Sequence, residues 1–260
     1  MVVSYDYGKD CFSDNEKILL SDELEYGMAI HNAKILRDYK LDEKNYALKI
    51  TADGGVLLAI RSGDYPMALA GSPAGVDELV LEIDRRGLVF TDILGASDIT
   101  AAFIAGYQKV HPIRFKKAVS MEIMAFEGEG KFCAEVAPVS AADVDTVAGF
   151  VRGFYRECFD EEVSPQSARE QAERMIPRML GYYADGRLAA IARPSRETNR
   201  YINISNVYTD PGYRGRGYMQ ALILHVCKLI QDAGKTPSLY VDVANPISSR
   251  VYKKVGFRSI

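Results

Sequence analysis

The sequence predicts an α/β (α+β) protein of two successive domains: an α/β domain is followed by a domain whose mixed, mostly antiparallel sheet is flanked by helices. Strand-like alternation and helix-like periodicity follow one another through both halves of the chain, which is typical of sheets packed against helices. At ~150 residues per domain, 260 residues make one large domain or two small ones. A polar link at Gly128-Glu129-Gly130 separates two β-rich stretches, so we expect domains over residues 1–128 and 129–260.

The first half alternates between helical and strand patterns, with glycines at the breaks. The β-rich stretches on either side of Asp53-Gly54-Gly55 predict a hairpin. Gly87 follows a helical pattern at the position where glycine commonly ends a helix. The expected elements are helices over residues 21–39, 76–86 and 97–110 and strands over 46–51, 56–61, 88–94 and 117–126.

The second half begins with a strand pattern and then a capped helix. Ser140 precedes apolar residues at helical spacing, as an N-cap does. Asp185-Gly186 between two short β-rich runs predicts a second hairpin. The expected elements are strands over 131–138, 181–184, 188–192, 201–208 and 239–243, and helices that begin after Ser140, at Pro165, at Tyr218 and after Asn245.

The most informative segment runs from Val207 to Met219, where a strand meets a turn with three glycines and then a helix. Glycines allow tight turns and a close approach of the backbone to a ligand. The free N–H groups and the positive dipole end of the following helix favour phosphate. Arg214 and Arg216 add fixed positive charge. The segment predicts a pyrophosphate-binding loop, with an ordinary helix-entry loop as the alternative.

Spacing distinguishes among the known phosphate loops. A P-loop would end in Gly-Lys-Ser/Thr, and this segment does not contain that sequence. A dinucleotide-binding fingerprint would have a third glycine at the position that Gln220 occupies. The order Arg214-Gly215-Arg216-Gly217 instead resembles the Arg-x-x-Gly-x-Gly/Ala signature of the GNAT N-acetyltransferase superfamily, whose loop holds the pyrophosphate of acetyl-CoA. Met219 departs from the glycine or alanine expected at the last position.

The C-terminal end resembles a second GNAT signature, Asn-x-x-Ser-x-x-x-Tyr-x-x-x-Gly-Phe. Asn245 suits an N-cap and Gly256 a helix end. Within such a helix, Asn245, Ser248 and Tyr252 share one face. Taken alone, Tyr252 is better explained as a core tyrosine with its hydroxyl in water. Two signatures in the right order, with a helix and a strand between them, favour the acetyltransferase interpretation.

The resemblance also covers the first half of the chain. The segments at residues 65–71 and 89–95 resemble the N-terminal domain of a two-domain bacterial group of GNAT proteins. In that group the N-terminal domain is a degenerate, incomplete GNAT fold. Residues 1–130 lack the cofactor signature, and Gly71 to Gly75 is interpreted as a turn. The family closes with a long pair of strands, whereas this sequence stops at Ile260. The last strand is therefore expected to be short, missing or supplied from elsewhere.

In the family, the strand before the loop splays from the next strand, and the pantetheine arm lies between them. The resemblance implies that the strand backbone and the loop amides hold acetyl-CoA, and that the start of the last helix contacts the pantetheine or adenosine part. The last helix also carries three basic residues, Arg250, Lys253 and Lys254. These side chains would contact the 3′-phosphate of CoA or would form an ordinary solvated face of the helix. The implied cofactor-binding residues are Val207, Tyr208, Thr209, Arg214, Gly215, Arg216, Gly217, Tyr218, Met219, Asn245 and Ser248.

The function implied by the resemblance is transfer of an acetyl group from acetyl-CoA, as co-substrate, to a primary amine of a small molecule or an amino terminus. The amine would attack directly, with Tyr252 as the general acid. The general base is not evident: Asn203, Ser205 and Asn206 lie where the family often has a Glu. The remaining candidates are a relayed water or one of Glu157, Asp160 and Glu161, although each of these three is better explained as a solvated surface charge. A catalytically silent acyl-CoA-binding or sensor module is the alternative.

The amino-acid composition favours some classes of binding partner and disfavours others. Residues 1–130 hold 14 basic and 21 acidic side chains, whereas residues 131–260 hold 18 and 14. A mildly basic second half suits a multiply negative cofactor but is too weak to indicate nucleic acid. The four cysteines and three histidines are dispersed, so we expect no metal. No apolar run reaches the ~20 residues of a membrane helix, and the first residues lack a leader pattern. We expect a cytoplasmic enzyme; a homodimer and the acceptor are left open.

Overall fold

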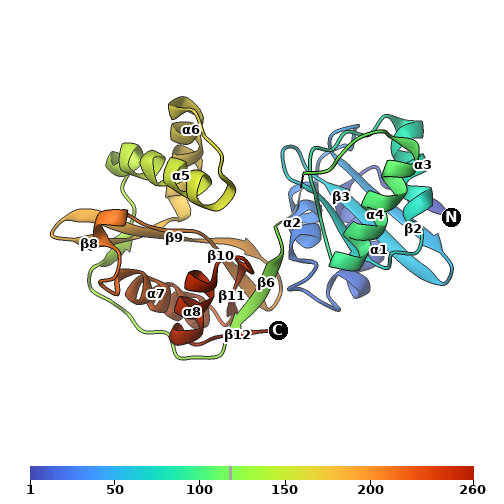
Figure 1. Ribbon diagram of the computed structural model, residues 1–260. Helices are drawn as coiled ribbons and strands as arrows, with labels where there is room; N and C mark the ends of the chain where they lie inside the picture. The colour runs from blue at the N-terminus through green and yellow to red at the C-terminus, as the bar shows by residue number, and fades with distance from the viewer. Residues whose placement is uncertain (117–118) are drawn as a thin grey trace. The chain divides into compact units, whose positions relative to one another are not determined.

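The computed structural model describes residues 1–116 and 119–260 (Figure 1). The chain divides into two compact units. The first comprises the residues up to 118 together with Glu197–Asn199, and the second comprises Val119–Arg196 and Arg200–Ile260. Each unit contains one mixed sheet flanked by helices, which confirms the predicted fold class.

The first unit is a five-stranded sheet in the order β1-β2-β3-β4-β5. Neighbouring strands are antiparallel except β4 and β5, which run parallel. Side chains of the central strands alternate between two apolar clusters, one beneath α1 and α2 and the other beneath α3 and α4. The elements are β1 (Val2–Ser4), α1 (Gly8–Leu19), α2 (Gly27–Ile35), β2 (Tyr46–Ala52), β3 (Gly55–Arg61), β4 (Met67–Gly71), α3 (Val76–Arg86), β5 (Ile93–Leu94) and α4 (Ser97–Val110).

Several predictions for the first unit are confirmed: the β2–β3 hairpin, helix α4, and helix α3 ended by Gly87 at φ 62°. The strand predicted over 88–94 is reduced to β5 at its end, which pairs with β4. Phe90 instead packs edge-on against Phe103 and Tyr107 of α4. The helix predicted over 21–39 shortens to α2, because Asp22 accepts backbone hydrogen bonds in a turn before it.

The second unit contains a seven-stranded sheet in the order β12-β6-β11-β10-β9-β8-β7. Helices α5 and α6 cover one face, and α7 and α8 cover the other (Figure 1). The elements are β6 (Met121–Phe126), β7 (Val136–Pro138), α5 (Val144–Phe159), α6 (Pro165–Met175), β8 (Leu180–Ala184), β9 (Arg187–Glu197), β10 (Tyr201–Thr209), α7 (Tyr218–Asp232), β11 (Thr236–Asp242), α8 (Pro246–Val255) and β12 (Phe257–Ser259).

Local signals in the second unit largely match the structure. Ser140 caps a short 3₁₀ turn that leads into α5, and its Oγ accepts the Ala142 amide at 3.1 Å. The β8–β9 hairpin turns at Asp185 and Gly186, both at positive φ. The strand predicted over 131–138 is shorter than expected, since only β7 pairs with β8. The helix predicted from Pro165 ends at Met175 and continues as a single 3₁₀ turn.

Strand β6 belongs to the second sheet, although it precedes the expected domain boundary. It lies between β11 and β12 and pairs antiparallel with both. The two compact units therefore separate at 118/119, whereas the sequence suggested 128/129. Residues 117 and 118 of the strand predicted over 117–126 lie outside the described residues. The last strand, β12, is short, as one of the expected alternatives stated. Its neighbour in the sheet is β6, which comes from an earlier part of the chain.

Both units repeat one order of elements: a strand, two helices, three strands, a helix, a strand and a helix. In the first unit this series runs from β1 to α4, and in the second from β7 to α8. None of the helices in the described ranges, 1–116 and 119–260, is both long and apolar enough to cross a membrane.

Candidate active site

The site begins where β10 and β11 separate. In the described residues the pairing of these parallel strands covers Tyr201–Asn203 with Thr236–Ser238. Asn203 marks the point of separation, and its Nδ2 donates to the Ser238 carbonyl oxygen at 3.4 Å. Asn206 has φ 51°, an uncommon conformation for a residue other than glycine. This irregularity lies in the part of β10 beyond the residues that pair with β11. The predicted cofactor-binding residues Val207, Tyr208 and Thr209 follow it directly.

The loop after β10 is built by local hydrogen bonds and two glycines. Asp210 Oδ1 accepts the Gly212 amide at 2.7 Å and caps a 3₁₀ turn. Gly215 and Gly217 have φ of 77° and 80°. A Cβ atom at either glycine would meet no atom within 4 Å, so the space beside the backbone is open. Their conformation favours glycine, and their surroundings leave room for a ligand.

Helix α7 begins beside this space with amides that have no hydrogen-bond partner among the described residues. The first backbone bond of the helix runs from the Ala221 amide to the Gly217 carbonyl oxygen, at 3.1 Å. The amides of Tyr218 and Met219 precede that bond, and no side chain caps this helix end. Unpaired amides at the positive end of a helix dipole are suited to a phosphate group. The chemistry of these donors therefore fits the pyrophosphate of acetyl-CoA.

The two loop arginines differ in their partners. Arg214 Nη2 donates to both carboxylate oxygens of Glu157, at 2.8 and 2.9 Å. Arg216 Nη2 donates only to the Gly212 carbonyl oxygen at 3.3 Å, and its guanidinium lies over the Tyr213 ring. Within the described residues no carboxylate pairs with Arg216. Arg216 therefore retains its charge for an anion, whereas that of Arg214 is neutralised.

Two contacts around the loop join residues far apart in the sequence, and no local pattern indicates them. The Tyr182 ring on β8 stacks on Tyr218 with centroids 4.4 Å apart, which supports the start of α7. Tyr208 Oη donates to Glu157 Oε1 at 2.8 Å and links β10 to α5. Sequence reasoning named Tyr208 only for its backbone and Glu157 only as a candidate base.

The start of α8 has the predicted cap. Asn245 Oδ1 accepts the Ser248 amide at 3.1 Å, and Pro246 occupies the first turn. The Asn245 side chain is thus used in capping the helix. Contacts of Asn245 and Ser248 with a cofactor remain a prediction.

Tyr252 is buried on the inner face of α8, with 9% of its surface exposed. Its ring packs edge-on against Phe257 with centroids 5.8 Å apart. Burial raises the pKa of the Tyr252 phenol well above its usual value, and the nearby Cys158 thiol at the end of α5 adds to the rise. The phenol is protonated at neutral pH, as a tyrosine with the usual pKa of ~10 also is.

The candidate bases have other roles or conformations. Burial alone would raise the pKa of the Glu157 carboxyl, but hydrogen bonds from Arg214 and Tyr208 outweigh it, so the pKa lies below its usual value. Burial, followed by the hydrogen bond to Glu157, raises the pKa of Tyr208 to about 12. Asp160 ends α5 in a left-handed conformation at φ 55°. Glu157 is therefore an ionised hydrogen-bond acceptor and a weak base.

Residues 148–257 match the family model of the acetyltransferase (GNAT) family. This part of the chain is a GNAT domain. It includes the separating strands, the glycine loop and all of α8. GNAT enzymes transfer an acetyl group from acetyl-CoA, and the loop of this GNAT domain has the geometry for that co-substrate.

Solved structures extend the likeness to the fold of the whole chain. A GNAT-family acetyltransferase from Colwellia psychrerythraea is 11% identical, with 100% of this chain and 96% of that one covered and a TM-score of 0.55. A Drosophila protein is also 11% identical, with 100% and 95% covered and a TM-score of 0.61. A protein from Novosphingobium aromaticivorans described as a GNAT-family acetyltransferase is 24% identical, with a TM-score of 0.44. That alignment covers 54% of this chain and only 59% of the other. No curated protein sequence matches the chain.

The first unit has a different loop at the position equivalent to the glycine loop. Gly75 precedes α3 at φ 91°, but a Cβ there would lie 2.6 Å from Ile50 Cγ2, so the space is filled. Asp77 and Glu78 make the first turn of α3 acidic. Filled space and negative charge both disfavour a phosphate, in contrast to the loop of the GNAT domain.

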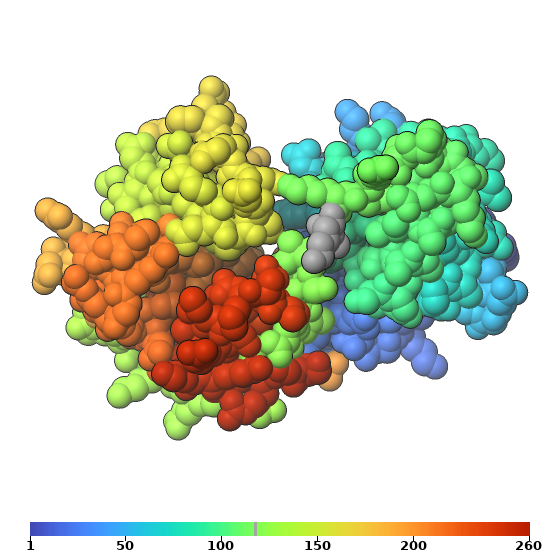
Figure 2. All heavy atoms as spheres, in the orientation of Figure 1, coloured from blue at the N-terminus to red at the C-terminus, as the bar shows by residue number. Residues whose placement is uncertain are grey.

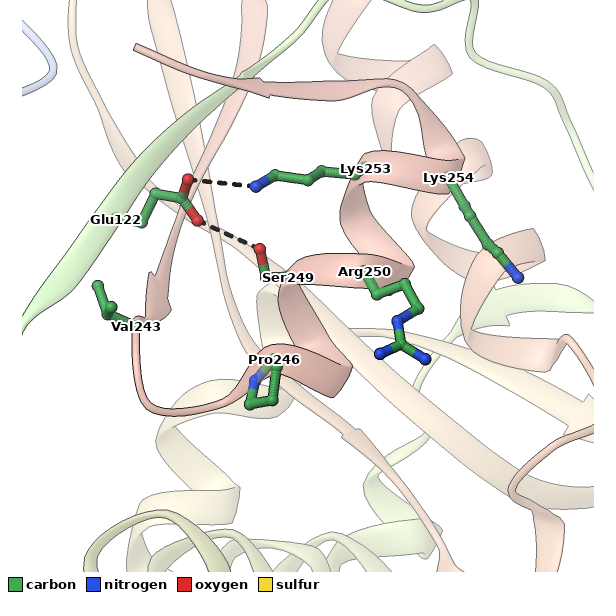
Figure 3. A pocket seen from close by; sticks show the side chains of 7 residues that line it. All are labelled: Glu122, Val243, Pro246, Ser249, Arg250, Lys253 and Lys254. Carbon is green, nitrogen blue, oxygen red and sulfur yellow. Dashed lines mark hydrogen bonds and ion pairs between the residues drawn. The ribbon is translucent and has the colours of Figure 1, made fainter.

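A separate pocket lies along the outer side of the GNAT domain's last helix (Figure 3). Its volume is about 830 Å³. Glu122 of β6 accepts from Ser249 Oγ at 3.2 Å and pairs with Lys253 at 3.4 Å. Arg250 and Lys254 have no ion pair among the described residues, and α8 is exposed at the surface (Figure 2). The pocket is lined by Glu122, Val243, Pro246, Ser249, Arg250, Lys253 and Lys254.

Proposed function

We propose that this protein moves an acetyl group from acetyl-CoA to a primary amine of a small molecule or an amino terminus, with Tyr252 as the general acid. The observation that supports this most is the open glycine loop at the start of α7. There, two glycines at positive φ stand in open space beside the start of α7, which no side chain of the described residues caps, and beside Arg216, which no carboxylate of those residues pairs with. A cytoplasmic location is part of the proposal.

Cofactor binding is assigned to main-chain groups of the GNAT domain. The amides of residues 214–219 would hold the pyrophosphate, with the Arg216 guanidinium close by. The end of β10, at Val207 to Thr209, lies beyond the residues that pair with β11 and would offer backbone groups on that side to the pantetheine arm, as an added strand would use them. Asn245 and Ser248 at the start of α8 are the remaining assigned contacts.

Proton transfer is assigned to Tyr252. When bound, acetyl-CoA supplies the thioester that the amine attacks. Thiols have pKa values near ~8.5, so the departing sulfur benefits from a proton. A tyrosine phenol, with a pKa of ~10, already holds its proton throughout the neutral range, and burial raises the pKa of Tyr252 further. A positioned proton donor of this kind is typically worth ~100- to 10,000-fold in rate.

The weak basicity of Glu157 favours acceptors that are already partly neutral. An α-amine has a pKa near ~8, whereas a lysine-like amine has one near ~10.4. Without a strong base, the fraction of neutral amine depends on the acceptor's own pKa. The proposal therefore favours α-amines and other weakly basic amines over lysine-like ones.

Release of free CoA thiol, measured over a panel of amines of graded pKa, tests the proposal. We expect turnover with α-amines at neutral pH and an increase with pH for stronger bases. Binding of acetyl-CoA without thiol release for any amine would support the silent acyl-CoA sensor instead. Absence of acetyl-CoA binding would overturn both.

A further inference from the structure

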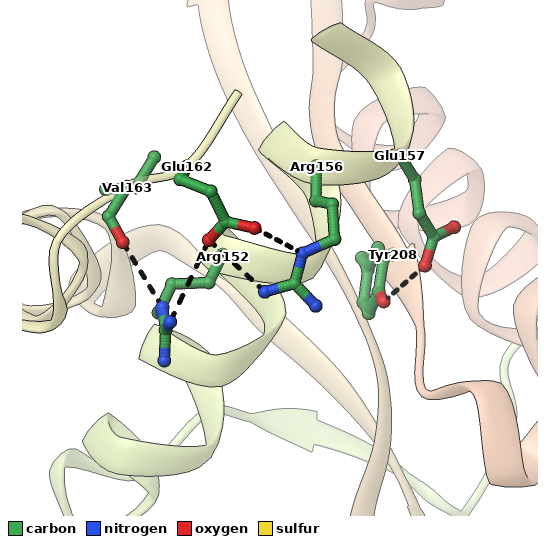
Figure 4. A network of polar contacts seen from close by, with 6 residues as sticks. All are labelled: Arg152, Arg156, Glu157, Glu162, Val163 and Tyr208. Carbon is green, nitrogen blue, oxygen red and sulfur yellow. Dashed lines mark hydrogen bonds and ion pairs between the residues drawn. The ribbon is translucent and has the colours of Figure 1, made fainter. Parts of the chain in front are cut away.

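One carboxylate joins α5, β10 and the glycine loop. Glu157 lies near the end of α5 and binds Arg214 through both of its oxygens, at 2.8 and 2.9 Å. The same carboxylate accepts the Tyr208 hydroxyl of β10 at 2.8 Å (Figure 4). A charged bond shared between both oxygens restricts orientation as well as distance.

Arg214 is held on three sides. Its Nε donates to the Thr209 carbonyl oxygen at 3.1 Å, and its guanidinium lies over the Tyr208 ring, 5.4 Å from the centroid. The side chain thus folds back from the loop onto the end of β10 and onto α5. Arg214 is the residue directly before Gly215, so these contacts determine where the glycine segment starts.

A glycine in α5, Gly153, allows this helix to approach β10 closely. A Cβ at Gly153 would overlap the Tyr208 hydroxyl, so only glycine allows this approach. Gly153 and Glu157 are four residues apart and lie on the same face of the helix. One turn after the glycine contact, the carboxylate therefore reaches both Tyr208 and Arg214.

A second network on the same helix does not reach the loop. Arg156 Nε donates to Glu162 Oε1 at 2.8 Å, and Arg152 Nε donates to the Val163 carbonyl oxygen at 3.2 Å (Figure 4). These contacts hold the segment after α5 to the helix. Glu162 thus offers a comparison: its carboxylate also binds an arginine but has no bond to the loop among the described residues, and its side chain is 66% exposed against 44% for Glu157.

We infer that Glu157 is a positioning residue for acetyl-CoA binding, which orders the glycine loop by holding Arg214 against Tyr208 and α5. The identity of the ligand rests on the proposed function. Glycine-rich segments lose much conformational freedom when they become ordered, so a loop ordered in advance binds its ligand more tightly. Glu157 acts through Arg214 and leaves the cation of Arg216 for the phosphate.

Calorimetric titration of acetyl-CoA into the full chain tests this role. We expect Glu157→Gln to weaken binding about 3- to 30-fold, allowing for the partial exposure of the pair. Glu162→Gln should change the affinity less than about twofold. In kinetics, the KM for acetyl-CoA should rise while kcat at saturation stays close to wild type. A fall in kcat with unchanged KM would overturn the inference, since it would place Glu157 at the reacting atoms.

A double-mutant cycle isolates the pair. If Glu157 acts through Arg214, then Glu157→Gln combined with Arg214→Met should bind no more weakly than the worse of the two single variants. Fully additive losses would overturn the inference. Tyr208→Phe, which keeps the ring and removes one donor to the carboxylate, should weaken binding by a smaller factor. This variant serves if Glu157→Gln fails to fold.

A measurement without ligand completes the test. In the CoA-free protein, Glu157→Gln should speed amide hydrogen exchange over residues 210–219, while Glu162→Gln should leave it unchanged. Equal exchange in both variants would overturn the inference. If the wild type binds no acetyl-CoA, the proposed function fails; if the wild type and Glu157→Gln bind equally, only this inference fails.

Discussion

The rings of Phe126 and Phe257 pack with centroids 5.1 Å apart. Phe126 ends β6, before the glycine-containing link, and Phe257 begins β12 at the end of the chain. Their contact closes the far edge of the second sheet and is supported by the bond from the Glu127 amide to the Gly256 carbonyl oxygen, at 3.0 Å. The second unit therefore includes residues that precede the 148–257 match.

Removing this contact should destabilise the second unit. Phe126 and Phe257 are 4% and 0% exposed, so truncation of either to alanine leaves a buried cavity. We expect Phe126→Ala to lower the free energy of unfolding by about 3–5 kcal/mol in urea denaturation. Phe132→Ala, at a half-exposed ring, is the control and should cost much less. A Phe126 variant as stable as this control would argue against β6 as an integral strand.

Gly217→Val should abolish acetyl-CoA binding in a folded protein. The side chain would fill the open space beside the loop and would be strained at φ 80°. Gly186→Val is a close control, since Gly186 has φ 74°, equally empty surroundings and a place in the β8–β9 turn. Both variants should lose similar stability, about 1–2 kcal/mol, but only Gly217→Val should lose binding by calorimetry. Wild-type affinity in folded Gly217→Val would contradict the loop assignment.

Tyr252→Phe should separate chemistry from binding. The change keeps the ring and its packing on Phe257 but removes the proton, so kcat should fall by about 100- to 10,000-fold. Acetyl-CoA affinity should stay within a few-fold of wild type. Single-turnover kinetics with the best amine provides the measurement, with Tyr46→Phe in the first unit as a buried-tyrosine control. Turnover within a few-fold of wild type would make Tyr252 a packing residue.

The acid side of the stability profile should depend on Glu82 in α3. Hydrogen bonds from Arg85 and Arg86 outweigh the effect of burial and lower the pKa of its carboxyl to about 2. A free Glu has a pKa near ~4.3, so this contribution is complete above that pH and is lost as the pH falls through about 2.

Urea denaturation of Glu82→Gln over a range of pH measures this contribution. We expect a loss of about 1–2 kcal/mol at pH 7 that disappears toward pH 2. Glu16→Gln, at an exposed position of α1, is the control. A Glu82→Gln difference that is independent of pH would show that the carboxylate charge is not the cause.

Many features of the fold and of the candidate site are local and were therefore predictable from sequence. Gly217 before an apolar helix, the Asn245 cap and the Gly87 helix end each depend on a few neighbouring residues. Conformational preference operates at that range, because positive φ favours glycine and a capping oxygen reaches an amide two or three residues away.

Where local patterns conflicted with packing, packing prevailed. The β-rich run from Leu88 predicted a strand, yet Phe90 packs edge-on against the rings of Phe103 and Tyr107, and strand pairing begins only at Ile93. The same holds for the domain boundary, since the glycine-containing link marks a turn after β6 and not the end of a compact unit.

The sequence by itself determined the glycine loop, its helix and the tyrosine helix of a GNAT domain, because each is encoded within one stretch of chain. Only the tertiary structure decided that β6 completes the second sheet and that Glu157 of α5 pairs with Arg214 of the loop. Pairing of distant strands and of distant charges depends on which surfaces meet after folding. No periodicity or spacing within a single segment carries that information.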